Sequence, residues 1–546
     1  MKTQDTANSR ISSRNGVTVD SSLSPTHTSV TPKRGSTAGG TTLTLTGTGF
    51  GTLLADATVT IFGVECTVQS VIDTEIQCVT NAFPRTEAQV PVDPVVIIAG
   101  GPGTAIVSGA TPEDTQFWYI DRWSSPYTWG CTDDTCKPVE GDIVVVPAGQ
   151  VILLDESTPI LAVLIVDGGQ FIWDDADGIE LHMHYGVVNN GGHFQIGTEE
   201  APFCNGDALI KMYGHQRSIN LPIYGAKVLA IRFGTIDIHG CPKTTTWTEL
   251  SQTAEIGDQS ITLTHPVKDD WFVGNQIIIA ATGDITNFHR SEKRNITSVS
   301  NDGYTVFLDS PLDWRHISVC SNGPGDNGLG WGWAGTICTR AEVGLLTRNV
   351  KMMGNFHEEW AEDLDECELG IGTAFGVQTC FQNRFGHETG SDQFGSVLFL
   401  HKPTYAKIEF FEVTHAGQAF NLARYPIHFH TPGALPTSYV RGCGIHNTFN
   451  RALTMHGVHN LTVEFNVIYN VMGLAFFLED AVEENNILRY NLGIMNKKSS
   501  SLLNIDSTPA RVTKIAYPGY AKICLKCVIF NQLRFSIEIM IIFSIN

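Results

Sequence analysis

Runs rich in Val, Ile and Thr, punctuated by Gly, Asn and Asp, recur throughout this 546-residue chain. The clearest alternation lies at Thr42–Thr46, where every second side chain would face the same side of a strand. Residues 57–80 offer three more short strands separated by turns. No long pattern with the 3.6-residue period of an amphipathic helix precedes the last segment. The sequence therefore predicts an all-β protein.

Residues 24–118 form the first predicted module. Two of its cysteines, Cys66 and Cys78, lie close enough in the sequence to join neighbouring strands. Its turns follow a pattern made by Pro32, Gly35, Gly39, Gly40, Gly47, Gly49, Phe50 and Gly51. This pattern resembles the IPT/TIG domain. The resemblance implies an immunoglobulin-like β-sandwich that serves as an adhesive or spacing module and carries no catalytic residues.

Residues 119–245 contain apolar runs of four to seven residues, which are typical of strands that are buried on both faces or stacked in layers. Glycines recur at the turns between these runs, at Gly141, Gly149, Gly168, Gly169, Gly186, Gly191, Gly192 and Gly197. This arrangement resembles the eight-glycine domain.

Three histidines of the second module invite a metal-site interpretation. His182 and His184 are two residues apart and would face the same side of a strand, and His193 follows on the next run. No carboxylate or cysteine completes a ligand set with them. We therefore interpret them as polar positions on successive strands, and we predict neither a metal ion nor a cofactor for the chain.

Residues 246–500 repeat internally. The segment Val440–Asn447 recurs as Val463–Asn470, and a third copy begins near Leu488, so the copies start 23 and 25 residues apart. A repeat of this length, with β-branched residues alternating, is typical of one coil of a parallel β-solenoid. In such a fold, neighbouring coils bury the apolar side chains that a single coil would leave exposed. We expect a parallel β-helix over this region.

The same repeat predicts a ladder of ionisable side chains. It places His456 over Glu479, since each lies 16 residues beyond the valine that starts its coil, and the preceding coil brings His430 to the same ladder. His428 would share the strand face of His430, and Asp480 follows Glu479. Such a group could perform acid/base catalysis or grip a sugar. It could equally be a polar ladder that satisfies its own hydrogen bonds.

The chain carries 35 Lys and Arg residues against 56 Asp and Glu residues, which gives a formal net charge of −21 at pH 7. Proteins that bind a phosphate backbone use clustered cations, so we do not expect a nucleic-acid partner. The acidic balance also disfavours an anionic polysaccharide at long range. Screening over about 10 Å nevertheless leaves room for a local basic groove.

Thirteen cysteines in an all-β chain suggest disulfides formed outside the cytosol. The close pairs are Cys66 with Cys78, Cys131 with Cys136, Cys204 with Cys241, Cys320 with Cys338, and Cys367 with Cys380. The alternatives are buried thiols or a zinc site, but no CxxC pairs with a second CxxC or with histidines at zinc-finger spacing. Asn295 and Asn460 each begin a glycosylation sequon.

The two ends of the chain differ from the modules between them. Residues 1–23 are polar and rich in Ser and Thr, with no apolar core of a signal peptide, and we expect them to be disordered. Residues 501–546 end in an Ile- and Phe-rich run that Arg534 and Glu538 interrupt. A charged pair inside a membrane span costs several kcal/mol, so we interpret this stretch as an irregular tail, a truncation artefact rather than an anchor.

The segments Arg424–His430, which reads ArgTyrProIleHisPheHis, and Ser438–Asn460 resemble the solenoid of the fibrocystin-L family and of its relatives, the cell-surface and secreted hyaluronidases. The order of an IPT/TIG unit, an eight-glycine domain and a solenoid favours the fibrocystin-L branch. The resemblance implies a right-handed parallel β-helix of the pectin-lyase type. It also implies an extracellular part of a large surface protein, whose membrane anchor lies outside this chain.

Two hypotheses on function follow. In the first, the chain belongs to a receptor-like or adhesive surface protein, and its β-helix presents a face to proteins or glycans. In the second, the chain is a glycan-cleaving enzyme of the hyaluronidase type, with His428, His430, His456 and Glu479 as candidate catalytic residues. Because the ladder forms no complete catalytic set, we favour the first hypothesis. Analogy of fold alone does not decide between them.

Overall fold

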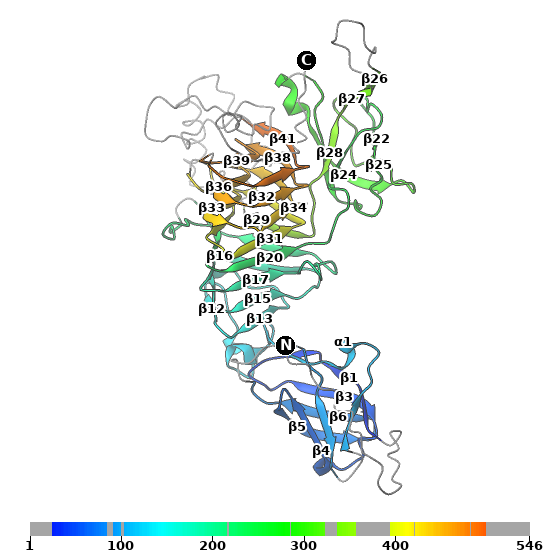
Figure 1. The fold of residues 1–546 in the computed structure, drawn as a ribbon, viewed down its shortest axis with the longest axis vertical. Helices are drawn as coiled ribbons and strands as arrows, with labels where there is room; N and C mark the ends of the chain where they lie inside the picture. Colours follow the sequence, from blue (N-terminus) through cyan, green and yellow to red (C-terminus); the bar gives the residue numbers. More distant parts are fainter. Residues whose placement is uncertain are drawn as a thin grey trace. The chain divides into compact units, whose positions relative to one another are not determined.

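The computed structural model describes residues 24–83, 91–99, 103–215, 218–283, 285–322, 336–355, 394–419, 421–480 and 482–497. The chain divides into two compact units, residues 1–137 and 138–546, each of which is built almost entirely of strands (Figure 1). The predicted all-β class is confirmed. The predicted polar segment 1–23, the tail 501–546, and Cys367 and Cys380 lie outside the described residues.

The first unit contains a β-sandwich. Its main sheet has the order β8-β7-β4-β5-β6-β3-β1-β9 and is antiparallel except where β9 meets β1. The strands are β1 (Thr26–Thr31), β3 (Thr42–Thr48), β4 (Ala57–Ile61), β5 (Val64–Ile72), β6 (Glu75–Thr80), β7 (Val95–Ile98), β8 (Gly103–Thr104) and β9 (Ile106–Val107). The short strands β2 (Arg34–Gly35) and β10 (Trp118–Tyr119) pair separately.

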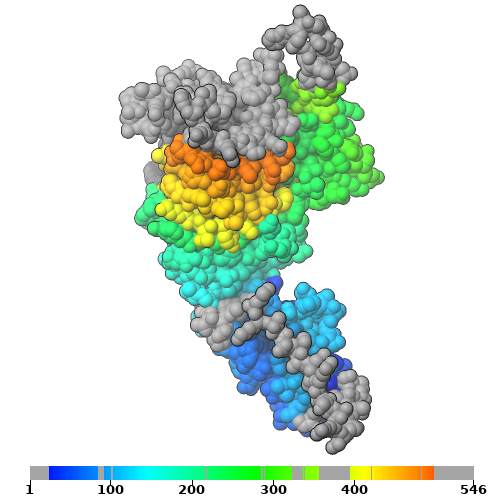
Figure 2. All heavy atoms as spheres, viewed as in Figure 1, coloured from blue at the N-terminus to red at the C-terminus, as the bar shows by residue number. Residues whose placement is uncertain are grey.

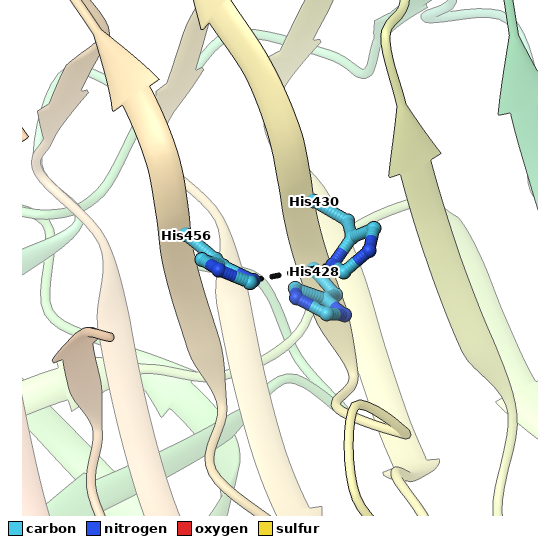
Figure 3. Close-up of side chains that lie close together, drawn as sticks. All are labelled: His428, His430 and His456. Atoms are coloured by element: carbon cyan, nitrogen blue, oxygen red, sulfur yellow. Dashed lines mark hydrogen bonds between the residues drawn. The ribbon is translucent and has the colours of Figure 1, made fainter. Parts of the chain in front are cut away.

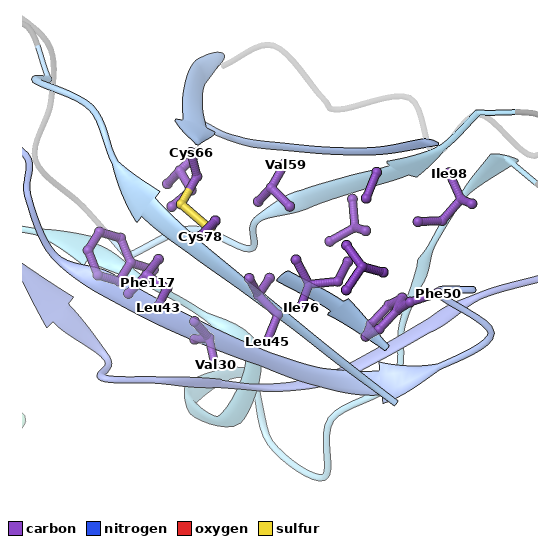
Figure 4. Close-up of a cluster of buried hydrophobic side chains, with 14 of the residues drawn as sticks. Val30, Leu43, Leu45, Phe50, Val59, Cys66, Ile76, Cys78, Ile98 and Phe117 are labelled. Atoms are coloured by element: carbon purple, nitrogen blue, oxygen red, sulfur yellow. A yellow bond between two sulfur atoms is a disulfide. The ribbon is translucent and has the colours of Figure 1, made fainter. Parts of the chain in front are cut away.

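Alternation of side chains produces the core of this sandwich. On β3, Leu43 and Leu45 are fully buried while the threonines between them face outward. The buried side chains of several strands meet in one cluster, which the Cys66–Cys78 disulfide joins across β5 and β6 (Figure 4). Such a cross-link stabilises the domain by roughly 3 kcal/mol in the chain-entropy view.

The second unit is a parallel β-helix, in which strands of successive coils stack in register (Figure 1). One of its faces is formed by β13 (Val151–Leu154), β15 (Gln170–Trp173), β17 (His193–Ile196), β20 (Thr235–His239), β31 (Tyr405–Glu409), β34 (Tyr439–Arg441), β37 (Thr462–Glu464) and β40 (Ile487–Arg489). Val440 lies opposite Val463, which lies opposite Leu488, so the register predicted from the repeat is present.

The other two faces diverge from one long strand, β16 (Ile179–Asn189), which follows β12 (Ile143–Pro147) and β14 (Leu161–Asp167). The first half of β16 pairs with β18 and its second half pairs with β19. One face then runs through β18 (Ala208–Met212), β29 (Val350–Gly354), β32 (Phe411–Ala416), β35 (Gly444–Thr448), β38 (Val467–Met472) and β41 (Leu492–Lys497). The other runs through β19 (Val228–Arg232), β30 (Val397–His401), β33 (Ile427–Ala434), β36 (Leu453–His459) and β39 (Phe476–Leu478).

Asparagines hold neighbouring coils together at their turns. The side-chain amide of Asn466 donates to the carbonyl of Val440 and to Oδ1 of Asn491, both at 2.9 Å. The amide of Asn470 donates to Oδ1 of Asn447 at 2.8 Å, and both of these residues have a left-handed backbone, which asparagine tolerates well. The repeated asparagines of the sequence therefore satisfy backbone groups that the turns would otherwise leave buried and unpaired.

The boundary expected near residue 245 lies where the chain leaves the parallel coils, between β20 and the next strand. The parallel coils already begin within residues 119–245, and residues 247–345 form an antiparallel insert instead of further coils. The insert contains β21 (Trp247–Glu249), β22 (Ser260–Thr262), β23 (Gln276–Ile279), β24 (Glu292–Val299), β25 (Thr305–Leu308), β26 (Ser318–Asn322), β27 (Thr336–Arg340) and β28 (Glu342–Leu345). Short apolar runs suit parallel and antiparallel strands alike, so periodicity alone did not separate the two.

The insert has a hydrophobic core of its own and also packs on the β-helix. Ile278 of the insert and Leu346, which directly follows it, share one buried hydrophobic cluster with Val467 and Tyr469 of β38, so the insert covers part of that face. Figure 2 shows the insert in green beside the yellow and orange coils. Among the described residues, helical structure is limited to short pieces: α1 (Pro112–Thr115), η2 (Leu54–Asp56), η3 (Pro126–Trp129), η4 (Asp134–Cys136) and η5 (Ile285–Arg290). No helix among the described residues is long and apolar enough to cross a membrane.

The remaining predicted cysteine pairs that lie in the described residues are bonded in the structure. They are Cys131–Cys136, Cys204–Cys241 and Cys320–Cys338. The Cys320–Cys338 bond joins β26 to β27, in which these two residues face each other across the antiparallel pair. The structure therefore contains the cross-links that the sequence predicted there.

Candidate functional site

The predicted ladder of histidines lies on the face of the β-helix that contains β33 and β36. His428 and His430 belong to β33, His456 belongs to β36, and Glu479 directly follows β39. His430 lies opposite His456 in the parallel pair, and the backbone N–H of Glu479 donates to the carbonyl of Met455. The three coils therefore place these side chains side by side, in the register expected from the repeat.

Alternation along β33 turns two histidines away from the coil interior. Ile427 and Phe429 are fully buried in the core of the β-helix, so His428 and His430 point to the opposite side of the strand. We refer to His428, His430 and His456 as the histidine cluster. Within the described residues it is the group of histidines, cysteines and carboxylates that could hold a metal ion, since one ligand atom from each lies within 4.8 Å of the others.

The three rings lie close together, with His428 and His430 on one strand and His456 on its neighbour (Figure 3). Nδ1 of His456 lies 3.2 Å from Nδ1 of His430, and the centroids of these rings are 4.9 Å apart. The rings of His428 and His456 are nearly parallel, with an angle of 8° between their planes and 6.2 Å between their centroids. The sequence predicted the membership of this cluster, and the structure supplies its geometry.

Two carboxylates border the histidine cluster. Oδ2 of Asp480 lies 2.9 Å from Nε2 of His456. Oε2 of Glu479 lies 3.7 Å from Nδ1 of His456 and 3.9 Å from Nε2 of His428, which is too far for a hydrogen bond. Asp480 is half exposed, whereas the side chain of Glu479 is 21% exposed. The site is therefore open to solvent on the side of Asp480.

Aromatic and cationic residues that the sequence analysis missed complete the surroundings. Phe399 lies opposite His428 in the parallel pair, and the ring of Tyr425 contacts His428 at 4.8 Å between centroids. Arg451 is buried, donates to the hydroxyl of Tyr425 at 2.8 Å and lies over the ring of Phe477. The Tyr425 ring just before the histidines was a sequence signal for such a cover, but Phe399, Arg451 and Phe477 come from other parts of the chain.

His401 is a further residue that sequence reasoning did not assign to the ladder. It lies opposite His430 in the pairing of β30 with β33, and the centroids of the two rings are 5.5 Å apart. Its Nδ1 is 3.2 Å from the hydroxyl of Tyr224. His401 precedes His430 by 29 residues, a spacing longer than that of the repeat, so the offsets of 23 and 25 residues did not reveal it.

Burial shifts the proton affinity of the cluster. It lowers the pKa of His428 well below the usual value, and the neighbouring His430 acts in the same direction. Burial and the proximity of His456 lower the pKa of His430 to about 4. Both imidazoles are therefore neutral at pH 7. Burial raises the pKa of the Glu479 carboxyl, although His456 and Arg451 partly oppose this.

Neutral imidazoles beside a carboxyl can act in several ways. They can donate and accept hydrogen bonds to sugar hydroxyls, or coordinate a transition metal. The surrounding aromatic rings exclude water on the side of His428, whose side chain is fully buried. The arrangement thus combines a desolvated end and a solvent-accessible end in one small site.

The histidines of the eight-glycine segment do not form a comparable group. Nδ1 of His182 lies 2.9 Å from the hydroxyl of Tyr213, and its Nε2 lies 3.0 Å from Glu180. Nδ1 of His193 lies 2.6 Å from the hydroxyl of Thr235, and its Nε2 lies 3.0 Å from Gln195. Both nitrogens of each ring are thus engaged by neighbours on their own sheets, which agrees with the structural interpretation of these histidines.

The two sequons lie in the described residues. Asn295 is on β24, where its side-chain amide donates to Oδ2 of Asp309 at 2.7 Å. Asn460 follows β36 and has a left-handed backbone with φ of 60°. Glycosylation of either residue remains a prediction.

Comparison with known proteins identifies three domain families along the chain. The models of the IPT/TIG domain, the G8 domain and the CEMIP β-helix match residues 25–110, 128–251 and 393–526, respectively. These matches follow the order predicted from the sequence. The G8 match ends close to residue 245, near the start of the antiparallel insert, and the coils before the insert stack on coils that follow it, as β20 does on β31.

Among the curated proteins, human fibrocystin-L is 45% identical over 498 residues, which cover 90% of this chain and 11% of that protein. Mouse fibrocystin-L is 43% identical over the same share of the chain, and mouse fibrocystin is 31% identical over 67% of it. The chain therefore spans about a tenth of the length of these relatives. The similarity extends through both units.

Proposed function

Since this chain belongs to the fibrocystin-L family, we propose that it is an extracellular segment of a receptor-like or adhesive surface protein, in which one face of the β-helix binds proteins or glycans. The observation that carries the proposal is the histidine cluster, whose side chains point outward from the coils and reach solvent at Asp480. Disulfides in both units support an extracellular location.

The faces of the β-helix differ in what they offer to a partner. The insert packs on β38, whereas the face with β33 and β36 carries ring, imidazole and carboxyl groups that can stack on and hydrogen-bond to a sugar or a peptide. Coils stacked in register hold these groups on a rigid support, which reduces the entropy lost on binding. This favours the histidine cluster as the centre of a binding surface.

The experiment measures binding and cleavage in the same samples. The purified 546-residue chain is passed over immobilised hyaluronan, heparan sulfate and neutral glycans on a biosensor, and the chain length of hyaluronan is followed on a gel. We expect retention on at least one of these glycan classes without shortening of hyaluronan, and at least tenfold weaker retention for His456→Ala. His193→Ala serves as the matched control because that histidine lies outside the cluster.

A hyaluronan hydrolase is the second candidate, and one observation favours it. Glu479 is a carboxyl with a raised pKa next to His456, a combination that suits a general acid. Shortened hyaluronan that persists in His193→Ala and disappears in a folded Glu479→Gln variant would replace the binding proposal with this one. If glycan binding and hyaluronan cleavage are lost only in variants that no longer fold, the side chains of the histidine cluster and Glu479 have a structural role instead.

A further inference from the structure

The buried end of the histidine cluster contains two polar atoms without partners. Nε2 of His428 and Oε2 of Glu479 are both buried and have no hydrogen-bond partner among the described residues. They face each other at 3.9 Å, and the side chain of His428 is completely shielded from solvent. An unpaired buried polar atom costs about 1–3 kcal/mol, so two of them facing one point require an explanation.

Hydrogen bonds determine which nitrogens of the neutral rings carry lone pairs. Nδ1 of His428 lies 2.9 Å from the carbonyl of Ala423 and must donate its hydrogen, because a carbonyl only accepts. Its Nε2 therefore presents a lone pair to the cluster. In the same way Nε2–H of His456 donates to Asp480, so its Nδ1 presents a lone pair. Two lone pairs and the Glu479 oxygen point at one region, where Nδ1 of His430 lies within hydrogen-bond distance of Nδ1 of His456.

We propose that His428, His430 and His456 bind one divalent transition-metal ion such as Zn²⁺, with the Glu479 carboxylate as the fourth ligand. Two ligands that sit at 2.0–2.1 Å from a tetrahedral zinc are separated by about 3.3 Å. The Nδ1 atoms of His430 and His456 are 3.2 Å apart, so this pair already has the required spacing. The ion would occupy the point where the unpaired atoms of His428 and Glu479 meet.

Two of the three histidines already have the second-shell partner that a metal site requires. Metal-bound histidines nearly always donate their other ring N–H to a carbonyl or a carboxylate, which orients the ring. The carbonyl of Ala423 does this for His428, and Asp480 does it for His456. The ligand chemistry selects the metal class: imidazoles suit zinc, copper and nickel, whereas Ca²⁺ and Mg²⁺ take oxygen ligands.

The proposal goes beyond the binding of a surface ligand and does not require it. A metal held by three histidines and one carboxylate can serve as a structural clamp between two coils, because His428 and His430 come from β33 and His456 from β36. It can also present an open coordination position to a ligand if Glu479 is displaced. Metal binding is measured directly, so failure of the metal site and failure of glycan binding are distinguishable.

The test uses the 546-residue chain, stripped of metal with a chelator and titrated with Zn²⁺ in a calorimeter. We expect one tightly bound ion per chain, and absorption of a tetrahedral site when Co²⁺ replaces Zn²⁺. His430→Ala and His456→Ala should weaken this binding at least tenfold. Asp480→Asn should weaken it roughly 10–100-fold, as second-shell changes do.

Matched controls keep the proposal falsifiable. His182→Ala and His193→Ala remove histidines outside the cluster and should change the affinity less than twofold. His430→Gln, with folding checked by circular dichroism, replaces His430→Ala if the latter unfolds. Absence of stoichiometric binding to the wild-type chain overturns the proposal, and so does equal binding by the cluster variants and the controls.

Discussion

Two histidine–carboxylate groups lie on neighbouring faces of the same β-helix, and only one of them is satisfied. His446 on β35 has its Nε2 3.0 Å from Oε1 of Glu412 on β32, and both side chains are nearly inaccessible to solvent. Nζ of Lys351 lies 3.0 Å from the same oxygen, and the backbone N–H of Arg348 donates to the other at 2.9 Å. In the histidine cluster, by contrast, one buried oxygen of Glu479 has no hydrogen-bond partner in the part of the chain that the structure describes.

The difference shows that residue type and stacking do not by themselves distinguish structure from function. Both groups are aligned by parallel pairing, in which Thr414 lies opposite His446 and His428 opposite Thr454. The satisfied group neutralises and pairs every buried charge, so its role is to hold the coils together. In the unsatisfied group, buried polar atoms without partners lower the stability of the fold. Sites with such a local cost are often the ones that bind a ligand or perform chemistry.

The largest predicted effect is on folding stability. Glu412→Ala removes the partner of His446 and Lys351 inside the fold, and breaking such a buried pair costs about 3–5 kcal/mol. Glu479→Ala, measured in the presence of a chelator, should cost less than about 1 kcal/mol because its buried oxygen makes no hydrogen bond. Urea unfolding followed by circular dichroism measures both. Equal losses would remove the distinction between the two groups.

The next effect is on acid stability. Burial alone would raise the pKa of Glu412, but hydrogen bonding to His446 and the charge of Lys351 lower it to about 2. A carboxyl with a lowered folded-state pKa stabilises the fold fully above its ordinary pKa, near 4.5, and loses this contribution as the pH falls toward 2. The loss amounts to about 3 kcal/mol.

Glu412→Gln tests this pH dependence. The stability difference between wild type and the variant should be largest above pH 5 and should shrink as the pH falls from 5 to 2, which urea unfolding at several pH values reveals. A difference that stays constant with pH would contradict the assignment of this carboxylate as a buried, ionised partner.

The smallest effect comes from two matched threonines. The hydroxyl of Thr414 lies 3.3 Å from Nδ1 of His446 and 3.1 Å from Nδ1 of His415, whereas the hydroxyl of Thr454 is buried without a partner. Thr414→Val should destabilise the fold by about 1 kcal/mol, and Thr454→Val should leave stability unchanged or raise it slightly. Thermal unfolding compares them. A larger loss for Thr454→Val would show that its hydroxyl is engaged.

The amino-acid sequence alone specified the all-β class and the register of the last coils. Glycine turns and apolar runs predicted an all-β chain, and the repeat that starts at Val440 and Val463 placed His456 over Glu479. These predictions held because the coils have nearly constant length, so that residues one repeat apart in the sequence lie next to each other in adjacent coils. Alternation on a strand then fixed which side His428 and His430 face.

Tertiary structure decided the rest, because it depends on contacts between segments of irregular spacing. The insert of residues 247–345 separates β20 from β29, yet β29 stacks directly on β18 from far earlier in the chain. His401 and Phe399 join the ladder at offsets that the repeat does not show. Whether a buried imidazole is paired or left open depends on which distant side chains and carbonyls reach it, and only the folded chain brings those groups together.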